Sequence, residues 1–167
     1  MQRLFLIVII LQCAFISKAQ EPKYNFKPTF CFAFDSINGQ ALLHQCSRAT
    51  TPKTISSYWN VTLRDMDQLY SNFKKIYAIT STACCHFGMK LKSLDRCIFQ
   101  CTGVIMGKKK YIYINACGYS EESINEENIK AWKIHPLIVC DGGSSYWGVL
   151  FSIDNREFSH LAFNGEG

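Results

Sequence analysis

The sequence predicts an α+β domain in which an antiparallel sheet of two meanders is covered by one main helix and stabilised by disulfides. Three observations lead to this class. Apolar side chains recur at helical spacing over residues 63–78. Segments rich in β-branched and aromatic residues alternate with polar turns from residue 85 onward. The chain of 167 residues has nine cysteines, and all but Cys13 follow residue 19.

The first nineteen residues have the features of a secretory signal peptide. A cationic start at Arg3 precedes an apolar stretch over residues 4–16, and small residues at Ser17 and Ala19 indicate cleavage before Gln20. The apolar stretch is shorter than the roughly 20 residues that a membrane-spanning helix needs. We therefore expect residues 1–19 to be removed and residues 20–167 to form a single secreted, extracellular, cysteine-rich domain without a membrane span.

Removal of residues 1–19 would leave an even number of cysteines, which in an oxidising compartment predicts four disulfides. The adjacent Cys84 and Cys85 are poorly placed to bond to each other, so each should have a different partner, and the pairing is otherwise open. Secretion argues against a thiolate zinc site, and we expect no metal and no cofactor. The disulfide cysteines are predicted to be Cys31, Cys46, Cys84, Cys85, Cys97, Cys101, Cys117 and Cys140.

The main helix is predicted to follow a glycosylation sequon. Asn60, Val61 and Thr62 form an N-glycosylation sequon, which we expect at the surface. Thr62 also precedes the helical pattern, with Asp65 three residues later in the position of a capping box. The helix should run over residues 63–78, with its apolar face formed by Leu63, Met66, Leu69, Tyr70, Phe73, Ile76 and Tyr77.

The remaining elements are predicted in chain order. Polar residues, including Lys108–Lys110 at a hairpin tip, separate the strands, and we interpret these lysines as a solvated turn rather than a contact for an anionic ligand. A short helix after Cys117 has a possible capping box from Ser123 and Glu126 and ends at His135 and Pro136. The predicted strands are 29–34 and 57–61 as edges, 85–92, 97–106 and 111–117 as the first meander, and 137–140, 146–153 and 158–163 as the second.

One stretch of the chain resembles a known class of domain. Cys101, Thr102 and Gly103 follow Cys97 by four residues, and Cys117 and Trp132 precede Ile138-Val139-Cys140. This pattern resembles the six-cysteine extracellular domains of nematode secreted and surface proteins, over residues 84–140. The resemblance implies a disulfide-bonded, β-rich domain without an established activity.

The charge distribution and the histidines bear on two classes of function, nucleic-acid binding and catalysis. The formal net charge of +5 comes from scattered residues, whereas a nucleic-acid-binding face would cluster them, so we expect no nucleic acid partner unless the protein is a nuclease. The four histidines lie in no recognisable catalytic motif. His86 and His135 are the candidate pair for the alternative function, a small secreted hydrolase of the nuclease type.

The function expected first is that of a secreted binding or effector protein acting through extracellular contacts, presented by loops such as 47–56 and 141–145. Its partner would be an extracellular protein of unknown identity or a small apolar ligand. A carrier of an apolar ligand is a further alternative, because aromatic and branched residues near the C-terminus could line a pocket, although core packing is their commoner role. These residues are Tyr146, Trp147, Val149 and Phe151.

Overall fold

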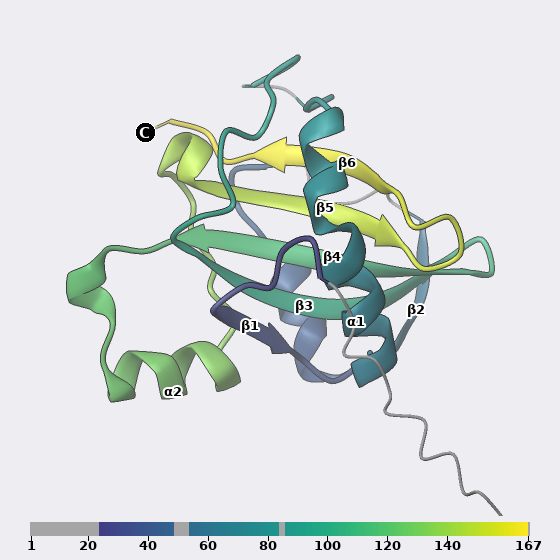
Figure 1. Ribbon diagram of the computed structural model, residues 1–167, viewed down its shortest axis with the longest axis horizontal. Coiled ribbons are helices and arrows are strands. Elements are labelled where there is room, and N and C mark those ends of the chain that lie inside the picture. Colours follow the sequence, from purple (N-terminus) through teal and green to yellow (C-terminus); the bar gives the residue numbers. More distant parts are fainter. Residues whose placement is uncertain (1–23, 49–53, 84–85, 167) are drawn as a thin grey trace, which may run out of the picture.

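A computed structural model of the chain describes residues 24–48, 54–83 and 86–166. The predicted signal peptide over residues 1–19, Cys84 and Cys85, and the middle of the predicted contact loop 47–56 lie outside the described residues. Within the described part, six strands form one mixed sheet, and short helices lie against both of its faces (Figure 1).

The sheet is ordered β1-β3-β4-β5-β6, and β2 also pairs with β3. β1 runs parallel to the first half of β3, whereas β2 runs antiparallel to its second half, so both strands lie along the same edge of β3. All other pairs are antiparallel. The strands are β1 (Phe30–Ala33), β2 (Ile55–Trp59), β3 (Cys97–Met106), β4 (Lys109–Gly118), β5 (Tyr146–Ser152) and β6 (Phe158–Phe163).

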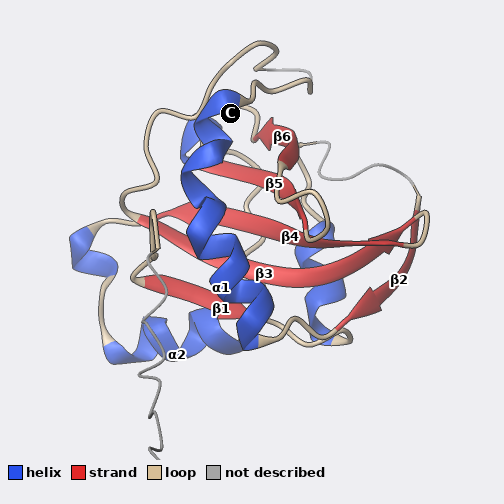
Figure 2. Ribbon diagram, turned by 45° about the vertical axis from the view of Figure 1, so that its right-hand side comes forward, coloured by secondary structure: helices blue, strands red, loops and turns tan. Residues whose placement is uncertain are grey.

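One face of the sheet is covered by α1 (Leu63–Asn72) and its 3-10 continuation η2 (Phe73–Ala78), which cross the strands obliquely (Figure 2). Thr62 caps α1 as predicted, because its side chain accepts from the Asp65 amide while the Asp65 carboxylate accepts from the Thr62 amide. The apolar side chains of this helix and of alternate strand positions form the larger core cluster. Fully buried members include Leu69, Phe73, Ile76, Phe99, Ile114, Val149 and Phe151.

The opposite face carries a smaller apolar cluster beneath η1 (Asn38–Leu43). Leu42 of η1 packs with Val104, Tyr113 and Leu150, which alternate along their strands with the residues facing α1. The second helix, α2 (Glu126–Ile134), lies beside β1, where Trp132 meets the ring of Phe30 edge-on. Two further 3-10 turns, η3 (Glu121–Ser123) and η4 (Gly143–Ser145), follow β4 and precede β5.

Several predicted elements are confirmed, and others are wrong in informative ways. β3 and β6 have the predicted bounds, and the predicted main helix is present, although its last third is 3-10. The predicted strands over residues 86–92 and 137–140 do not form. The six observed strands all belong to one sheet. α2 is capped by the Asn125 side chain, which accepts from the Asn128 amide, and not by Ser123. Ser123 belongs to η3 and α2 begins only at Glu126, so Asn125 is the residue placed to accept from the third amide of the helix.

Among the described residues, no helix is both long enough and apolar enough to cross a membrane.

A candidate binding cleft at one end of the sheet

An open cleft of about 530 Å³, which we call the sheet-end cleft, lies among the described residues. Its position follows from strand register. Cys97 at the start of β3 pairs with Gly118 at the end of β4, and Cys117 pairs with Tyr146 at the start of β5. Three strand ends are therefore level with one another, at the left-hand end of the sheet in Figure 1. The cleft is lined by residues 89–93, 95–97, 118–120, 144–147 and 163.

One wall of the cleft is the segment that leads into β3. Leu91 and Leu94 are buried in the larger core cluster and anchor this segment. The amide of Leu94 also donates to the hydroxyl of Tyr77 in η2, at 3.1 Å. Lys90 and Lys92, which alternate with these anchors, are exposed at the rim. A run without strand pairing is thus held in place by two apolar side chains, and its cations face solvent.

The floor of the cleft is aromatic and its rim is cationic. Trp147 and Phe163, which pair between β5 and β6, are 1% and 2% exposed. The ionisable rim residues are Lys90, Lys92, Arg96 and Asp95, so cations exceed carboxylates by two. Arg96 forms a 3.1 Å ion pair with Glu121, but both side chains are well exposed and the pair contributes little. The cleft therefore favours a ligand that combines an apolar group with negative charge.

The Cys97 thiol lies in the cleft but is not a nucleophile in this state. Burial raises the pKa of Cys97 to about 11, against the opposing effect of a hydrogen bond with the Trp147 side chain. Burial likewise raises the pKa of Cys117 to about 12. Reactive cysteines need a pKa lowered towards neutrality, since the thiolate is the attacking species. These thiols are protonated at neutral pH, and neither has the environment of a redox or protease nucleophile.

The two candidate catalytic histidines are on opposite faces of the sheet. The imidazole of His86 packs edge-on against Phe163, which belongs to the α1 face. His135 is the C-cap of α2, and its carbonyl accepts from Gln100, which points to the other face. Neither is among the residues that line the cleft. The described structure thus does not assemble the paired histidines that the hydrolase alternative requires.

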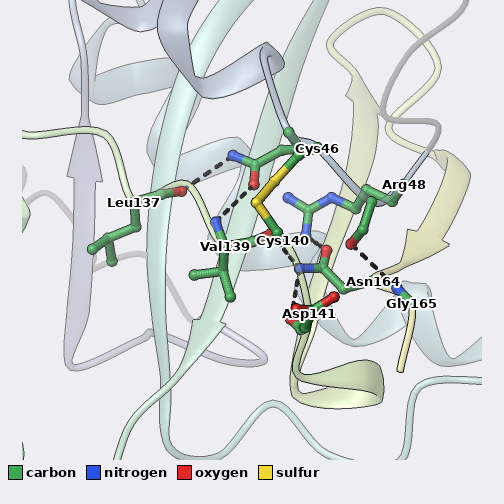
Figure 3. Close-up of a disulfide and its surroundings, with 10 residues drawn as sticks. Cys46, Arg48, Leu137, Val139, Cys140, Asp141, Asn164 and Gly165 are labelled. Atoms are coloured by element: carbon green, nitrogen blue, oxygen red, sulfur yellow. Dashed lines mark hydrogen bonds between the residues drawn. A yellow bond between two sulfur atoms is a disulfide. The ribbon is translucent and has the colours of Figure 1, made fainter. Parts of the chain in front are cut away.

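The second wall of the cleft is formed by the loop that follows residues 137–141. We call residues 137–141 the clamped segment, and the sequence predicted a strand over 137–140. Residues 137–141 form no strand, and side-chain amides hold them in place (Figure 3). Gln45 and Asn115 both donate to the carbonyl of Leu137, at 3.1 and 2.8 Å. Asn164 donates to the carbonyls of Val139 and Asp141, at 2.6 and 3.0 Å. Side-chain amides thus take the place that a neighbouring strand would have for the carbonyls of Leu137, Val139 and Asp141.

A disulfide completes this clamp. Cys46 and Cys140 are bonded, which joins the segment after η1 to the clamped segment (Figure 3). The next residues form the predicted contact loop 141–145, whose Gly143 amide donates to the carbonyl of Gly165 at 3.0 Å. Ser144 and Ser145 of this loop line the cleft. The disulfide and the side-chain amides therefore position one wall of the cleft.

Arg48 donates hydrogen bonds to the two asparagines that hold the clamped segment. The residue is only 9% exposed, and its guanidinium donates to Asn164 at 2.8 Å, to the Tyr113 hydroxyl at 3.2 Å and to the Asn115 side chain. Gly148 makes this approach possible, since a Cβ there would lie 2.7 Å from the Tyr113 hydroxyl and 3.2 Å from Arg48 Nε. A buried guanidinium with neutral acceptors thus orders the two asparagines that hold the clamped segment.

Sequence reasoning missed this group of polar residues. Gln100 and Asn115 stand within strands that are apolar on both sides, and their alternation with Phe99 and Ile114 puts them on one face. That alternation was the available signal, because polar side chains inside otherwise buried strands need partners. Arg48 carried no comparable signal, since it lies in a polar loop far from its partners in sequence.

The aromatic cluster proposed for an apolar-ligand carrier is divided between core and cleft. Val149 and Phe151 are fully buried in the larger core cluster. Tyr146 and Trp147 border the cleft, and Trp147 also belongs to that core. All residues of β5 after Tyr146 are buried, so the strand packs on both faces.

Comparisons with known proteins found no matching family model, curated protein or solved structure. Within the described ranges, no group of three or more histidine, cysteine or carboxylate side chains is arranged to hold a metal ion.

Proposed function

We propose that the protein is a secreted, disulfide-stabilised binding or effector protein, and that the sheet-end cleft is its contact site for a segment of an extracellular protein. The single observation that carries this proposal is the composition of the cleft, which combines an aromatic floor with a cationic rim. Such a site recognises a short segment with an aromatic or aliphatic anchor beside acidic residues. The resemblance of residues 84–140 to nematode extracellular domains supports an extracellular role.

A binding function also agrees with how the cleft is built. Its two walls are held by buried leucines on one side and by the Cys46–Cys140 clamp on the other. A preorganised site loses less conformational entropy when a ligand binds. No described histidine lines the cleft, and Cys97 is not a nucleophile either as a protonated thiol or within a disulfide, so the geometry supports recognition better than hydrolysis.

Secretion implies two covalent features that we propose together with this function. The first is a set of four disulfides in the mature chain, of which Cys46–Cys140 is one. The second is a glycan on Asn60. This side chain is exposed, and its Oδ1 accepts from the Ser36 amide at 2.7 Å, which leaves Nδ2, the atom that carries an N-linked glycan, without a partner in the described structure. An Asn60→Gln variant should lose the mass that glycosidase treatment removes from the wild type.

The cleft proposal is tested by selecting peptides from a random display library on the immobilised protein. Selected peptides should contain an aromatic or aliphatic residue next to acidic residues. A Lys90→Glu/Lys92→Glu variant should bind them at least about tenfold more weakly, because two attractive rim charges become repulsive.

The matched control is Lys108→Glu/Lys109→Glu, which makes the same charge change at the exposed β3–β4 hairpin, the opposite end of these strands. This control should bind like the wild type. Equal loss in both variants would indicate a general charge effect, and unchanged affinity in the Lys90→Glu/Lys92→Glu variant would refute the cleft as the site.

A further inference from the structure

The thiols of Cys31 and Cys101 are in contact across the first pair of strands. Their sulfur atoms are 3.8 Å apart, although the residues are 70 positions apart in the chain. Cys31 lies in β1 opposite Phe99 of β3, and Cys101 lies two residues further along β3 on the same face. The two thiols therefore have the proximity that a cross-strand disulfide needs.

Competing partners for Cys31 are turned away from it. Cys97 also lies two residues from Phe99, but its sulfur lies 3.5 Å from the Asp95 carbonyl and contacts the Trp147 side chain at the floor of the cleft. Cys117 pairs with Ile98 and therefore points to the opposite face of the sheet. Of the described cysteines outside the Cys46–Cys140 bond, only Cys101 has its sulfur against that of Cys31.

We propose that Cys31 and Cys101 form a disulfide in the mature protein, tying the parallel edge strand β1 to the centre of the sheet. Each thiol gives up a proton, and the pair gives up two electrons to the disulfide of a thiol–disulfide oxidoreductase or of oxidised glutathione, which becomes two thiols. A disulfide requires a sulfur separation of about 2.05 Å, so the side chains must close the remaining gap. β1 is a four-residue edge strand paired only with β3, so it can shift to allow this.

A Cys31–Cys101 disulfide would hold the N-terminal segment of the described chain in place. The N-terminal segment before β1 packs on α1, where Phe26 meets Phe73 edge-on and Tyr24 donates to Asp67 at 2.5 Å. Cys101 itself is fully buried in the core beneath. The link would therefore fix the start of the mature chain against both the sheet and the helix.

The pairing is tested by peptide mapping without reduction on the full chain expressed in a eukaryotic host, using peptic digestion at acidic pH, where thiol exchange is suppressed. Phe99 lies between Cys97 and Cys101, and Phe34 lies between Cys31 and Cys46, so cleavage at these aromatic residues separates all four cysteines. We expect a linked peptide pair containing Cys31 and Cys101. Recovery of Cys31 linked to another cysteine, or alkylated in the unreduced protein, would overturn the proposal.

The inference rests on the secretion proposed above, and the experiment separates the two. Protein retained in the cell is treated with oxidised glutathione and mapped in the same way. Linkage in that sample without any protein in the medium would refute secretion and keep the pairing. Absence of the Cys31–Cys101 peptide from both samples would refute the pairing whatever its location.

A stability measurement gives a second, independent test. In a Cys31→Ala/Cys101→Ala variant we expect the thermal unfolding midpoint to fall by about 5–15 °C relative to the oxidised wild type. A thiol reductant should remove at least half of that difference, because the wild type then loses the same bond. A difference that the reductant leaves unchanged would show that only packing was lost and would contradict the link.

Discussion

At the scale of single residues, the notable feature is a buried cation held by neutral groups. The guanidinium of Arg48 meets two asparagine oxygens and a tyrosine hydroxyl, and no carboxylate is paired with it in the described part of the chain. Charge-assisted hydrogen bonds of this kind are stronger than neutral ones. Removing the cation would take this donor from the buried Oδ1 atoms of Asn115 and Asn164, and leaving such acceptors unsatisfied is more costly than losing the bonds alone.

Replacement of Arg48 therefore tests the clamp. We expect Arg48→Met to lower the free energy of unfolding by about 2–4 kcal/mol, because Asn115, Asn164 and Tyr113 lose their shared donor. Chemical denaturation measures the change. Arg64→Met, at an exposed position of α1, is the matched control and should alter stability by less than about 0.5 kcal/mol. Equal effects of the two substitutions would show that the buried cluster contributes nothing.

At the scale of elements, the start of α1 combines a cap with a sequon. Thr62 is both the third residue of the predicted sequon and the N-cap of the helix. Two large apolar side chains, Ile37 and Leu63, are 78% and 85% exposed beside Asn60, which the Ser36 amide contacts. A glycan on Asn60 would extend from the surface that carries these side chains.

The cap has an effect that can be measured apart from any glycan. On enzymatically deglycosylated protein, Thr62→Ala should lower the free energy of unfolding by about 1 kcal/mol, since the amide of Asp65 loses its acceptor. Thr62→Ser keeps both the hydroxyl and the sequon and should remain within a few tenths of a kcal/mol of the wild type. A loss in Thr62→Ser as large as that in Thr62→Ala would attribute the effect to the methyl group instead.

The elements also show what the sequence can and cannot predict. The α1 helix was predictable because its apolar residues recur at helical spacing, and the β3 and β6 strands because they are rich in apolar residues and lie between polar turns. The 86–96 loop also carries spaced apolar residues, but Leu91 and Leu94 anchor it without a neighbouring strand. The extended segment 137–141 has side-chain amides as partners. Local alternation does not show which partner a backbone will find, and the sheet-end cleft depends on strand register, which is a long-range property.

At the scale of the whole molecule, one disulfide joins regions that are far apart in sequence and next to the cleft. Cys46 and Cys140 are 94 positions apart, and the bond precedes the loop that carries Ser144 and Ser145. The same bond therefore contributes to global stability, by restricting the unfolded chain, and to the shape of the cleft wall.

Both roles predict measurable losses. Cys46→Ala/Cys140→Ala should lower the free energy of unfolding by about 2–4 kcal/mol and weaken the binding of selected peptides under conditions where the variant is still folded. Denaturant titration and binding assays measure the two effects. Ile138→Ser, at an exposed position of the same segment, should change neither quantity appreciably. If the folded double variant bound the peptides as tightly as the wild type, the disulfide would not be needed for the shape of the cleft.

The most direct test of the central claim, that the sheet-end cleft is the binding site, follows the tryptophan indole N–H signals in an NMR titration of the full chain with a selected peptide. Trp147 lies at the floor of the cleft, whereas the Trp59 indole donates to the carbonyls of Val104 and Tyr111 towards the other end of β3. The proposed function predicts a saturable shift of the Trp147 signal with the Trp59 signal unchanged. A shift of Trp59 without a shift of Trp147 would contradict it.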